Sequence, residues 1–196
     1  MIRFLDFIFS LLGIVILMPF FILVSILIKL NSKGSLIYKQ SRVGLNNADF
    51  FVFKFRTMKM NSDKSGLLTV GGRDPRITSI GFYLRKYKLD ELPQLFNVLI
   101  GEMSLVGPRP EVRKYVDLYT KEQLSVLNVK PGITDYASIE YADENEILGT
   151  ALDPDKVYIN EIMPVKILLN MKDIQNKNVK EYFKIIFLTL KKIIKN

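Results

Sequence analysis

Residues 4–28 read FLDFIFSLLGIVILMPFFILVSILI, an apolar run in which Asp6 is the sole charge. As an α-helix, a run of this length would span roughly 38 Å, more than the hydrocarbon thickness of about 30 Å. Asp6 lies near the end of the run, where it can reach the membrane interface. A signal peptide is a poor interpretation, because the run is too long and no small-residue cleavage site follows it. The stretch therefore predicts a membrane anchor.

Pro19 lies in the middle of this run, and two arrangements of the anchor are compatible with it. Proline cannot donate a hydrogen bond to the carbonyl of Val15, and its ring crowds the preceding turn. One arrangement is a kinked helix that spans the bilayer once. The other is a re-entrant helix–break–helix that enters and leaves through the same leaflet. Cations flank both sides, with Arg3 before the run and Lys29 and Lys33 after it, whereas a spanning helix favours asymmetry.

The composition limits the chemistry that this chain of 196 residues can perform. With 48% hydrophobic residues it is not a disordered chain, and its length suits an anchor at 1–30 followed by one domain at 31–196. It contains no Cys and no His, which excludes a thiolate nucleophile and the commonest general base. Any metal must be held by oxygen ligands, which favours Mg²⁺ or a similar hard cation. The net charge of +8 predicts an anionic partner: nucleic acid, anionic lipid or a phosphorylated substrate.

Behind the anchor, the patterns predict an α+β domain that is mainly helical with one small β-hairpin. SLIYKQSR (35–42) and DFFVFKFR (49–56) carry β-branched and aromatic residues and flank a polar loop, as the strands of a hairpin do. Gly, Ser, Asp and Pro over 59–76 predict a loop, and 77–87 has the pattern of a short helix. The remaining expectations are a helix over 117–129, a turn over 130–137, and helices on either side of Pro164 in 151–171.

The C-terminal stretch EYFKIIFLTLKKIIKN, residues 181–196, is amphipathic. Phe183, Phe187 and Ile194 lie on one side of a helix, and the lysines lie nearer the other. Such a helix either packs into a core or lies in the membrane interface. The density of lysine beside bulky apolar residues favours the interface.

An acidic pair, Asp90 and Glu91, occurs in KLDELPQL, residues 88–95. Leucines at helical spacing around it predict one helix over 89–99 with one apolar face. The pair then has two interpretations. It is simply a helix start, where the dipole favours acids. Alternatively, the two carboxylates do separate jobs on one substrate: one attacks or accepts a proton, and the other holds a metal or orients its neighbour.

Cations occur near this pair or in neighbouring motifs: Arg85, Arg109 of GPRPE, Lys54 and Arg56 of KFRTMK, and Arg76. The prolines flanking Arg109 fix the backbone and lower the entropy cost of presenting its fork of donors. Carboxylates, a hard cation and arginines together form a phosphoryl-transfer site, in which the cations neutralise phosphate oxygens. The competing interpretation is a solvated basic surface, or cations attracted to anionic lipid.

Five motifs occur in a fixed order: QSRVG, FKFRTM, RDPRITSIGFYLR, LDELPQLFNVLIGEMSLVGPRPE and KPGIT. Together they resemble the bacterial sugar transferases of the small monotopic phosphoglycosyl transferase type, in their minimal form. The resemblance extends from the anchor to about residue 135 and is most specific between residues 40 and 113. It implies a re-entrant anchor broken at a proline, which matches Pro19. It also implies a monotopic protein on the cytoplasmic face of the bacterial inner membrane, in contact with membrane lipid.

The resemblance implies an activity as well. Such enzymes move a phosphosugar from a UDP-sugar onto undecaprenyl phosphate, giving undecaprenyl diphosphate sugar and UMP, in the first membrane step of glycan assembly. They act through a covalent phosphosugar–aspartate and require Mg²⁺. Carried over, Asp90 is the nucleophile, and Glu91 supports the metal and the orientation, so that both acids are candidate metal ligands. Arg109 and Arg85 would bind phosphate.

The chain departs from the family pattern at two positions that bear on this interpretation. Met18 precedes the anchor proline where members often have serine, whose hydroxyl can bond the helix backbone and help the bend. The break would then rest on Pro19 and packing. Asp135 follows Thr134 where many members have glycine, which affects substrate preference if this turn lies near the nucleotide or sugar.

Two other functions compete with this one. A non-catalytic, membrane-bound module could bind anionic lipid or a partner protein, with the acid pair as a helix cap. Nucleic-acid binding is suggested only by charge, since no groove-reading or base-stacking motif accompanies it, and the anchor argues against it. The apolar surface of the anchor could face lipid or another subunit, so a homo-oligomer is compatible with the sequence.

Overall fold

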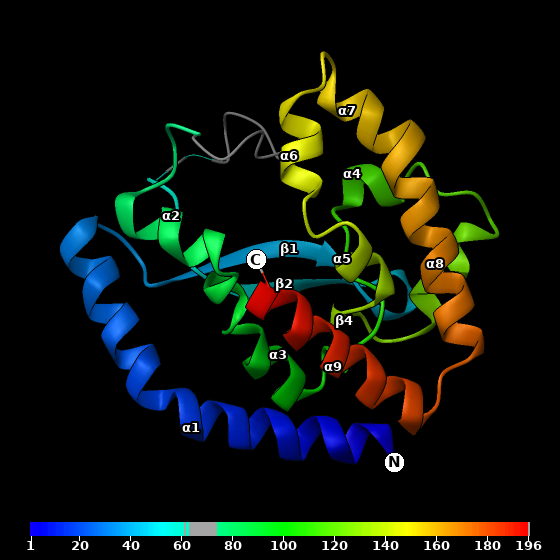
Figure 1. Cartoon of the computed structure of the whole chain (residues 1–196), viewed down its shortest axis with the longest axis horizontal. Coiled ribbons are helices and arrows are strands. Elements are labelled where there is room, and N and C mark those ends of the chain that lie inside the picture. The colour runs from blue at the N-terminus through cyan, green and yellow to red at the C-terminus, as the bar shows by residue number, and fades with distance from the viewer. Residues whose placement is uncertain (61, 63–73, 196) are drawn as a thin grey trace.

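The computed structural model describes residues 1–60, 62 and 74–195. Its first element, helix α1 (Ile2–Asn31), continues through Pro19. Figure 1 shows α1 bent, so that its two halves run in different directions along the edge of the molecule. Because Pro19 removes the hydrogen bond to Val15 and crowds that turn, we attribute the bend to this residue. By length and composition, α1 is a candidate membrane helix.

The N-terminal end of α1 is held by the domain that follows it. Arg3 donates a hydrogen bond of 2.8 Å to the carbonyl of Leu99. Asp6, which is 2% exposed, accepts bonds of 2.9–3.0 Å from the hydroxyls of Ser104 and Tyr182 and from one backbone amide. The one acid of the apolar run thus points into the protein and does not reach for the interface.

The predicted hairpin is confirmed. Strands β1 (Ile37–Val43) and β2 (Asp49–Phe55) pair antiparallel, with Ile37 opposite Phe55 and Val43 opposite Asp49. The connection η1 (Leu45–Asn47) places two asparagines at positive φ, a conformation that asparagine tolerates better than most residues.

Helix α2 (Ser79–Lys86) confirms the short helix predicted over 77–87. Thr78 caps it, accepting a 3.0 Å bond from the amide of Gly81. Gly81 also lies against Thr57, two residues beyond the end of β2, where an added Cβ would lie 2.0 Å from the Thr57 carbonyl oxygen. Of the loop predicted over 59–76, residues 61 and 63–73 lie outside the described residues.

The single helix predicted over 89–99 is wrong. Leu89–Glu91 form the 3₁₀ turn η3, and helix α3 (Gln94–Ile100) begins only after Pro93. Proline lacks an N–H but fits at a helix start, so it begins α3 instead of continuing an earlier helix. The apolar face was predicted correctly, because the leucines of both pieces pack against α1.

A second small sheet lies where the sequence predicts a turn. Strand β3 (Ser104–Val106) pairs parallel with β4 (Gly132–Thr134), and the turn predicted over 130–137 is therefore partly strand. The helix predicted over 117–129 is also wrong, since the helical element described in that range is the short 3₁₀ helix η4 (Gln123–Asn128). The short helix α4 (Arg113–Val116) precedes it, and α5 (Tyr136–Glu140) follows β4. In these segments tertiary pairing outweighs weak local patterns.

The helices that follow cover one side of the molecule in Figure 1. They are α6 (Glu144–Gly149), α7 (Pro154–Val157), the π-helical turn η5 (Tyr158–Ile162) and α8 (Met163–Gln175). Helical structure on both sides of Pro164 confirms the prediction for this segment. The wide π turn stands immediately before this proline, which cannot supply an ordinary helical N–H.

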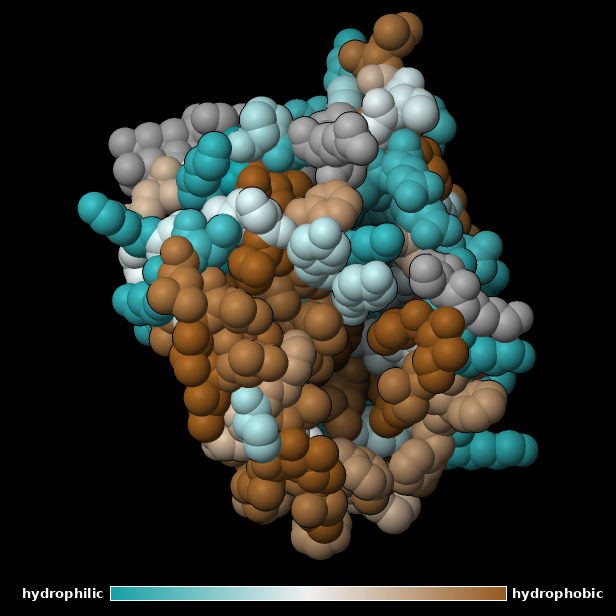
Figure 2. Space-filling model, turned by 60° about the vertical axis from the view of Figure 1, so that its left-hand side comes forward, coloured by the Kyte–Doolittle hydropathy of each residue, from teal (hydrophilic) through white to brown (hydrophobic). Residues whose placement is uncertain are grey.

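The C-terminal helix α9 (Val179–Lys195) both packs into a core and presents an apolar face. Tyr182 and Ile185 are buried beside β3, whereas Phe187 and Leu190 are exposed. Phe183 contacts Phe9 of α1, with ring centroids 5.9 Å apart, so that α9 and the N-terminal half of α1 lie side by side. Figure 2 shows apolar side chains covering much of the lower part of the molecule in that view.

We expect Asp6→Ala to lower the thermal midpoint of the detergent-solubilised protein by several degrees, because it leaves two buried hydroxyls and an amide without an acceptor. Ser10→Ala is the matched control. Ser10 is also buried in α1, but its hydroxyl bonds only the carbonyl of Phe7 in the same helix. Equal midpoints for the two variants would contradict a role for Asp6 in holding α1 to the domain.

Candidate active site

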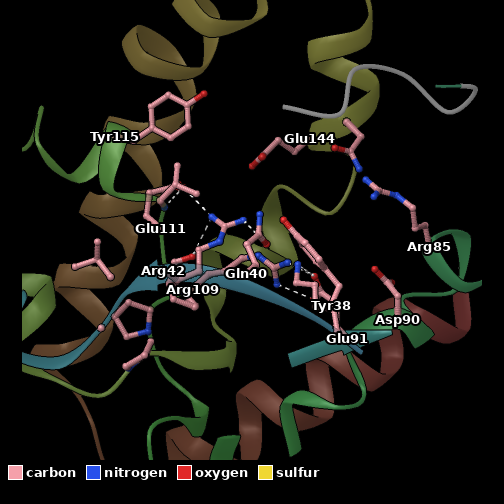
Figure 3. Close-up of a pocket in the computed structure, with 18 of the residues that line it drawn as sticks. Tyr38, Gln40, Arg42, Arg85, Asp90, Glu91, Arg109, Glu111, Tyr115 and Glu144 are labelled. Atoms are coloured by element: carbon pink, nitrogen blue, oxygen red, sulfur yellow. Dashed lines mark hydrogen bonds and ion pairs between the residues drawn. The ribbon is translucent and has the colours of Figure 1, made fainter. Parts of the chain in front are cut away.

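A cavity of about 460 Å³ lies between the hairpin, the η3 turn, the turn that carries Arg109, and helices α6 and α8. Figure 3 shows Asp90 and Arg85 pointing into it from one side, with Glu111 and Tyr115 on another. Each site residue predicted from the sequence lines this cavity: Lys54, Arg56, Arg76, Arg85, Asp90, Glu91 and Arg109. The fold thus brings together residues that lie up to 55 positions apart in the sequence.

Asp90 is presented by a strained turn. Lys88, the residue before η3, has a φ of 56°, a left-handed conformation that costs a non-glycine residue about 1 kcal/mol or more. The turn leaves Asp90 only 8% exposed, and within the described part of the chain no side chain or amide donates a hydrogen bond to its carboxylate. Burial, followed by the negative charge of Glu91, raises the pKa of Asp90 to about 6. Among the described residues, this buried carboxylate is therefore left without a hydrogen-bond or ion-pair partner.

Glu91 has the opposite environment. Arg109 donates to both of its carboxylate oxygens, one of these bonds being 2.9 Å, and Lys54 adds a 2.9 Å ion pair. Although burial opposes ionisation, the charges of Arg109 and Lys54 hold the pKa of Glu91 well below its usual range. Burial in turn lowers the pKa of Lys54. Glu91 is therefore an ionised, fixed counter-charge beside Asp90.

The turn that carries Arg109 is positioned by a buried acid. Asp135 is 0% exposed and accepts a 3.0 Å bond from the Arg109 amide, while also capping α5. Gly107 and Gly132 pack back to back beside it, since an added Cβ on Gly132 would lie 2.1 Å from the Gly107 nitrogen. Asp135 does not line the cavity. Asp135, which stands where many family members have glycine, therefore acts through its bond to the backbone of Arg109. It does not act through direct contact with a ligand in this cavity.

The other predicted cations differ in what holds them. Arg76 pairs with Asp74 at 2.6 Å, which lowers the pKa of Asp74, chiefly through side-chain hydrogen bonds. Arg56 is buried and donates to Ser32, just beyond α1. Arg85 lies on the last turn of α2 and points into the cavity (Figure 3).

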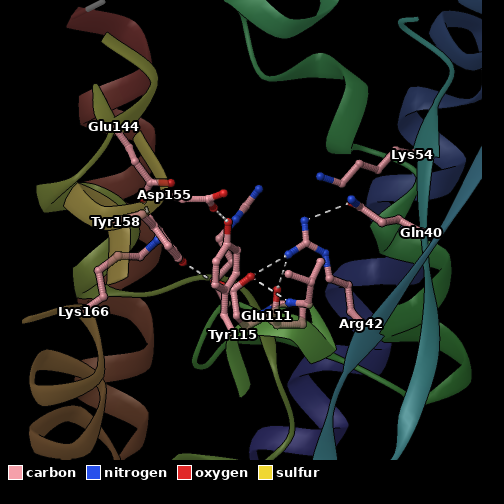
Figure 4. A network of polar contacts seen from close by, with 12 residues as sticks. Gln40, Arg42, Lys54, Glu111, Tyr115, Glu144, Asp155, Tyr158 and Lys166 are labelled. Carbon is pink, nitrogen blue, oxygen red and sulfur yellow. Dashed lines mark hydrogen bonds and ion pairs between the residues drawn. The ribbon is translucent and has the colours of Figure 1, made fainter. Parts of the chain in front are cut away.

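A polar network that the sequence did not predict forms another wall of the cavity (Figure 4). Glu111 joins Arg42 at 3.0 Å and accepts a bond from the hydroxyl of Tyr158, and Lys166 pairs with Glu144 at 2.7 Å. These residues come from β1, the segment after GPRP, η5, α6 and α8. Nothing in the local sequence signals their convergence.

The cavity offers little protein ligation to a metal. Among the described residues there is no group of three or more Asp, Glu, His or Cys side chains that could hold an ion. Mg²⁺ usually takes one or two carboxylates together with substrate phosphates. The unpaired carboxylate of Asp90 fits that requirement. Glu91 fits it less directly, because both of its oxygens already accept bonds from cations.

A long apolar helix, which is a candidate membrane helix by length and composition, is thus joined to a domain whose cavity brings several cations close to the carboxylates of Asp90 and Glu91. The family model described as bacterial sugar transferase matches residues 1–196. The chain belongs to this bacterial sugar transferase family.

Named relatives share this similarity. A UDP-N-acetylgalactosamine-undecaprenyl-phosphate N-acetylgalactosaminephosphotransferase of Aeromonas hydrophila is 38% identical over 80% of this chain and 38% of its own length. A putative undecaprenyl-phosphate N-acetylgalactosaminyl 1-phosphate transferase of Bacillus subtilis is 44% identical, over 61% of this chain and 67% of its own length. The UDP-glucose:undecaprenyl-phosphate glucose-1-phosphate transferase of Escherichia coli is 34% identical, over 80% of this chain and 35% of its own length. The matched region thus spans between about a third and two thirds of these relatives.

The two adjacent acids should have opposite effects on stability when neutralised. At pH 7.5, Asp90→Asn removes a buried, unpaired charge, whose pKa of about 6 compares with 3.8 for an ordinary Asp, and should raise the free energy of unfolding by up to about 3 kcal/mol. Glu91→Gln leaves Arg109 and Lys54 without their counter-charge and should lower it by about 2–4 kcal/mol. Chemical unfolding in detergent measures both.

The pH dependence of the stability change caused by Asp90→Asn tests whether ionised Asp90 destabilises the folded protein. Because the folded protein binds the Asp90 proton more tightly than the unfolded chain does, this group favours folding below about pH 4 and loses that contribution as the pH rises through about 6. The gain from Asp90→Asn should therefore shrink at pH 5. Asp49→Asn, at an exposed acid paired with Arg113, is a control expected to change stability by less than about 1 kcal/mol. Destabilisation by Asp90→Asn would contradict an unpaired carboxylate.

Proposed function

We propose that this protein transfers a phosphosugar from a UDP-sugar to undecaprenyl phosphate, giving undecaprenyl diphosphate sugar and UMP, as a first membrane step of glycoconjugate assembly. The observation that carries the proposal is the free, buried carboxylate of Asp90 in a cavity rich in cations. The printed names of the relatives, which act on undecaprenyl phosphate and UDP-sugars, support the two substrates. Some of these names specify N-acetylgalactosamine and others glucose, so the sugar is left to experiment.

The proposed reaction has two displacements at one phosphorus atom. A carboxylate oxygen of Asp90 attacks the phosphorus that carries the sugar, and the bond from that phosphorus to the UMP oxygen breaks, so that UMP leaves with the electron pair. A phosphate oxygen of the acceptor then attacks the same phosphorus and expels the Asp90 carboxylate. No proton has to be removed from either nucleophile, which suits a chain without histidine or cysteine.

The residues around Asp90 supply charge and position. Glu91 keeps Arg109 and Lys54 fixed at the cavity wall, and these cations together with Arg85 would stabilise the negative charge of the diphosphate. Mg²⁺, held by Asp90 or Glu91 with the substrate phosphates, would add Lewis-acid neutralisation of the phosphate oxygens. Burial and the negative charge of Glu91 raise the pKa of Asp90, whereas the positive charges of Lys54, Arg85 and Arg109 lower it.

A monotopic, re-entrant placement of α1 at the cytoplasmic face belongs to this proposal. Arg3 and Asp6 near one end of α1 bond residues of the domain, and Ser32, just beyond the other end, bonds Arg56 of the same domain. These contacts at both ends of α1 support an N-terminus on the same side of the bilayer as the domain. Exposed apolar side chains of α1 and α9 would rest in the lipid.

The direct test is release of UMP by the purified protein in detergent, supplied with undecaprenyl phosphate, Mg²⁺ and a panel of UDP-sugars. Asp90→Asn keeps the shape of the side chain but removes the nucleophile, and should lower turnover by about a thousandfold or more. Wild-type-like turnover of this variant would exclude Asp90 as the nucleophile. Absence of UMP with every sugar would favour the alternative, a non-catalytic module that binds anionic lipid or a partner protein.

The pH profile offers a separate test. Asp90 attacks only as a carboxylate, so kcat/KM for the UDP-sugar should fall as the pH drops through about 6, with the slope of a single proton. Glu91, with its pKa held well below the usual range, should add no second inflection there. A rate that is constant from pH 7.5 to pH 5 would contradict this assignment.

A further inference from the structure

Among the residues that the structure describes, Arg56 is a buried cation without an acidic partner. The residue is 6% exposed, and its Nη2 donates to the carbonyl and the hydroxyl of Ser32, at 2.7 and 2.9 Å. Its Nε and Nη1 are buried and donate to no acceptor within the described residues. No ion pair joins Arg56 to an acid in that part of the chain either. Two hydrogen-bond donors and one positive charge are therefore left uncompensated.

Such an arrangement is costly in a folded protein. Each buried donor without an acceptor costs about 1–3 kcal/mol, and a buried charge without a counter-charge costs more. Three other arginines that line the same cavity have an ion-pair partner. Arg42, Arg76 and Arg109 each pair with a carboxylate, those of Glu111, Asp74 and Glu91 respectively. Arg56 is thus suited to an anion that the described part of the chain does not provide.

The place of Arg56 in the fold indicates which anion. It follows the last residue of β2 and lines the cavity that contains Asp90. Through Ser32 it is bonded to the chain immediately after α1, the helix whose apolar surface suits a bilayer. Ser35, also just beyond α1, lines the same cavity. A phosphate attached to a membrane-embedded chain enters the polar domain at this junction, whereas a soluble nucleotide does not have to pass it.

We propose that Arg56 binds the phosphate monoester of the lipid acceptor, in a subsite distinct from the cations that face the donor diphosphate. The inference rests on the proposed function and adds to it the position of the acceptor. A phosphate dianion would accept bonds from Nε and Nη1 and neutralise the buried charge. Its free oxygen would then share one cavity with Asp90, as the second displacement requires.

The test compares Michaelis constants for the two substrates. Arg56→Gln removes the charge and keeps a polar side chain, and should raise KM for undecaprenyl phosphate by about tenfold or more while KM for the UDP-sugar stays within about twofold. Arg113→Gln is the matched control, because Arg113 pairs with Asp49 and lies outside the cavity. An unchanged KM for the acceptor, or an equal rise for both substrates, would overturn the subsite. An inactive wild-type protein would instead count against the proposed function.

A binding measurement keeps the inference testable without turnover. Farnesyl phosphate should raise the thermal midpoint of the wild-type and Arg113→Gln proteins, farnesol should not, and Arg56→Gln should lose the effect. Equal protection by inorganic phosphate at the same concentration would overturn a lipid-specific site. If Arg56→Gln does not fold, Ser32→Ala removes only the hydroxyl that holds Arg56 and should reduce the protection by farnesyl phosphate. Full protection of that variant would contradict the proposal.

Discussion

The ion pairs of Glu91 with Arg109 and Lys54 are the interaction on which the cavity depends. They join the η3 turn, strand β2 and the GPRP turn, three segments that are separate in the sequence. Because Glu91 takes the nearest cations as partners, its neighbour Asp90 is left buried and unpaired beside a negative charge. The two adjacent acids therefore differ in pKa because of residues on other elements, and not because of any difference between Asp and Glu.

Local patterns predicted much of the fold. The alternating strands and asparagine loop of the hairpin, the helix α2 and the helical structure around Pro164 are all carried by neighbouring residues. The prediction over 89–99 was wrong because leucines at helical spacing are satisfied equally by a 3₁₀ turn followed by a helix. The strand β4 was missed because three residues paired in parallel leave too short a pattern to recognise.

Long-range polar partners account for most of what the sequence did not reveal. Asp6 was interpreted as an interfacial charge, yet its carboxylate bonds Tyr182, 176 residues away, inside the protein. Seven of the residues that line the candidate site were predicted individually, since the acid pair and the basic motifs are visible in the sequence. Their pairing was not predicted, because no local sequence pattern indicates that Arg109 bonds Glu91 or that Glu111 bonds both Arg42 and Tyr158.

Three destabilising features meet in one cavity: the positive φ of Lys88, the unpaired Asp90 and the unpaired Arg56. Asp90 and Arg56 have opposite charges and line the same space, yet no ion pair joins them among the described residues. Each is held by its own element, Asp90 by the η3 turn and Arg56 by its bonds to Ser32. An ion pair between them would have neutralised the carboxylate and occupied the donors of the guanidinium. Under the proposed function, keeping them apart leaves room for phosphate between the two side chains, and packing elsewhere must offset the loss of stability.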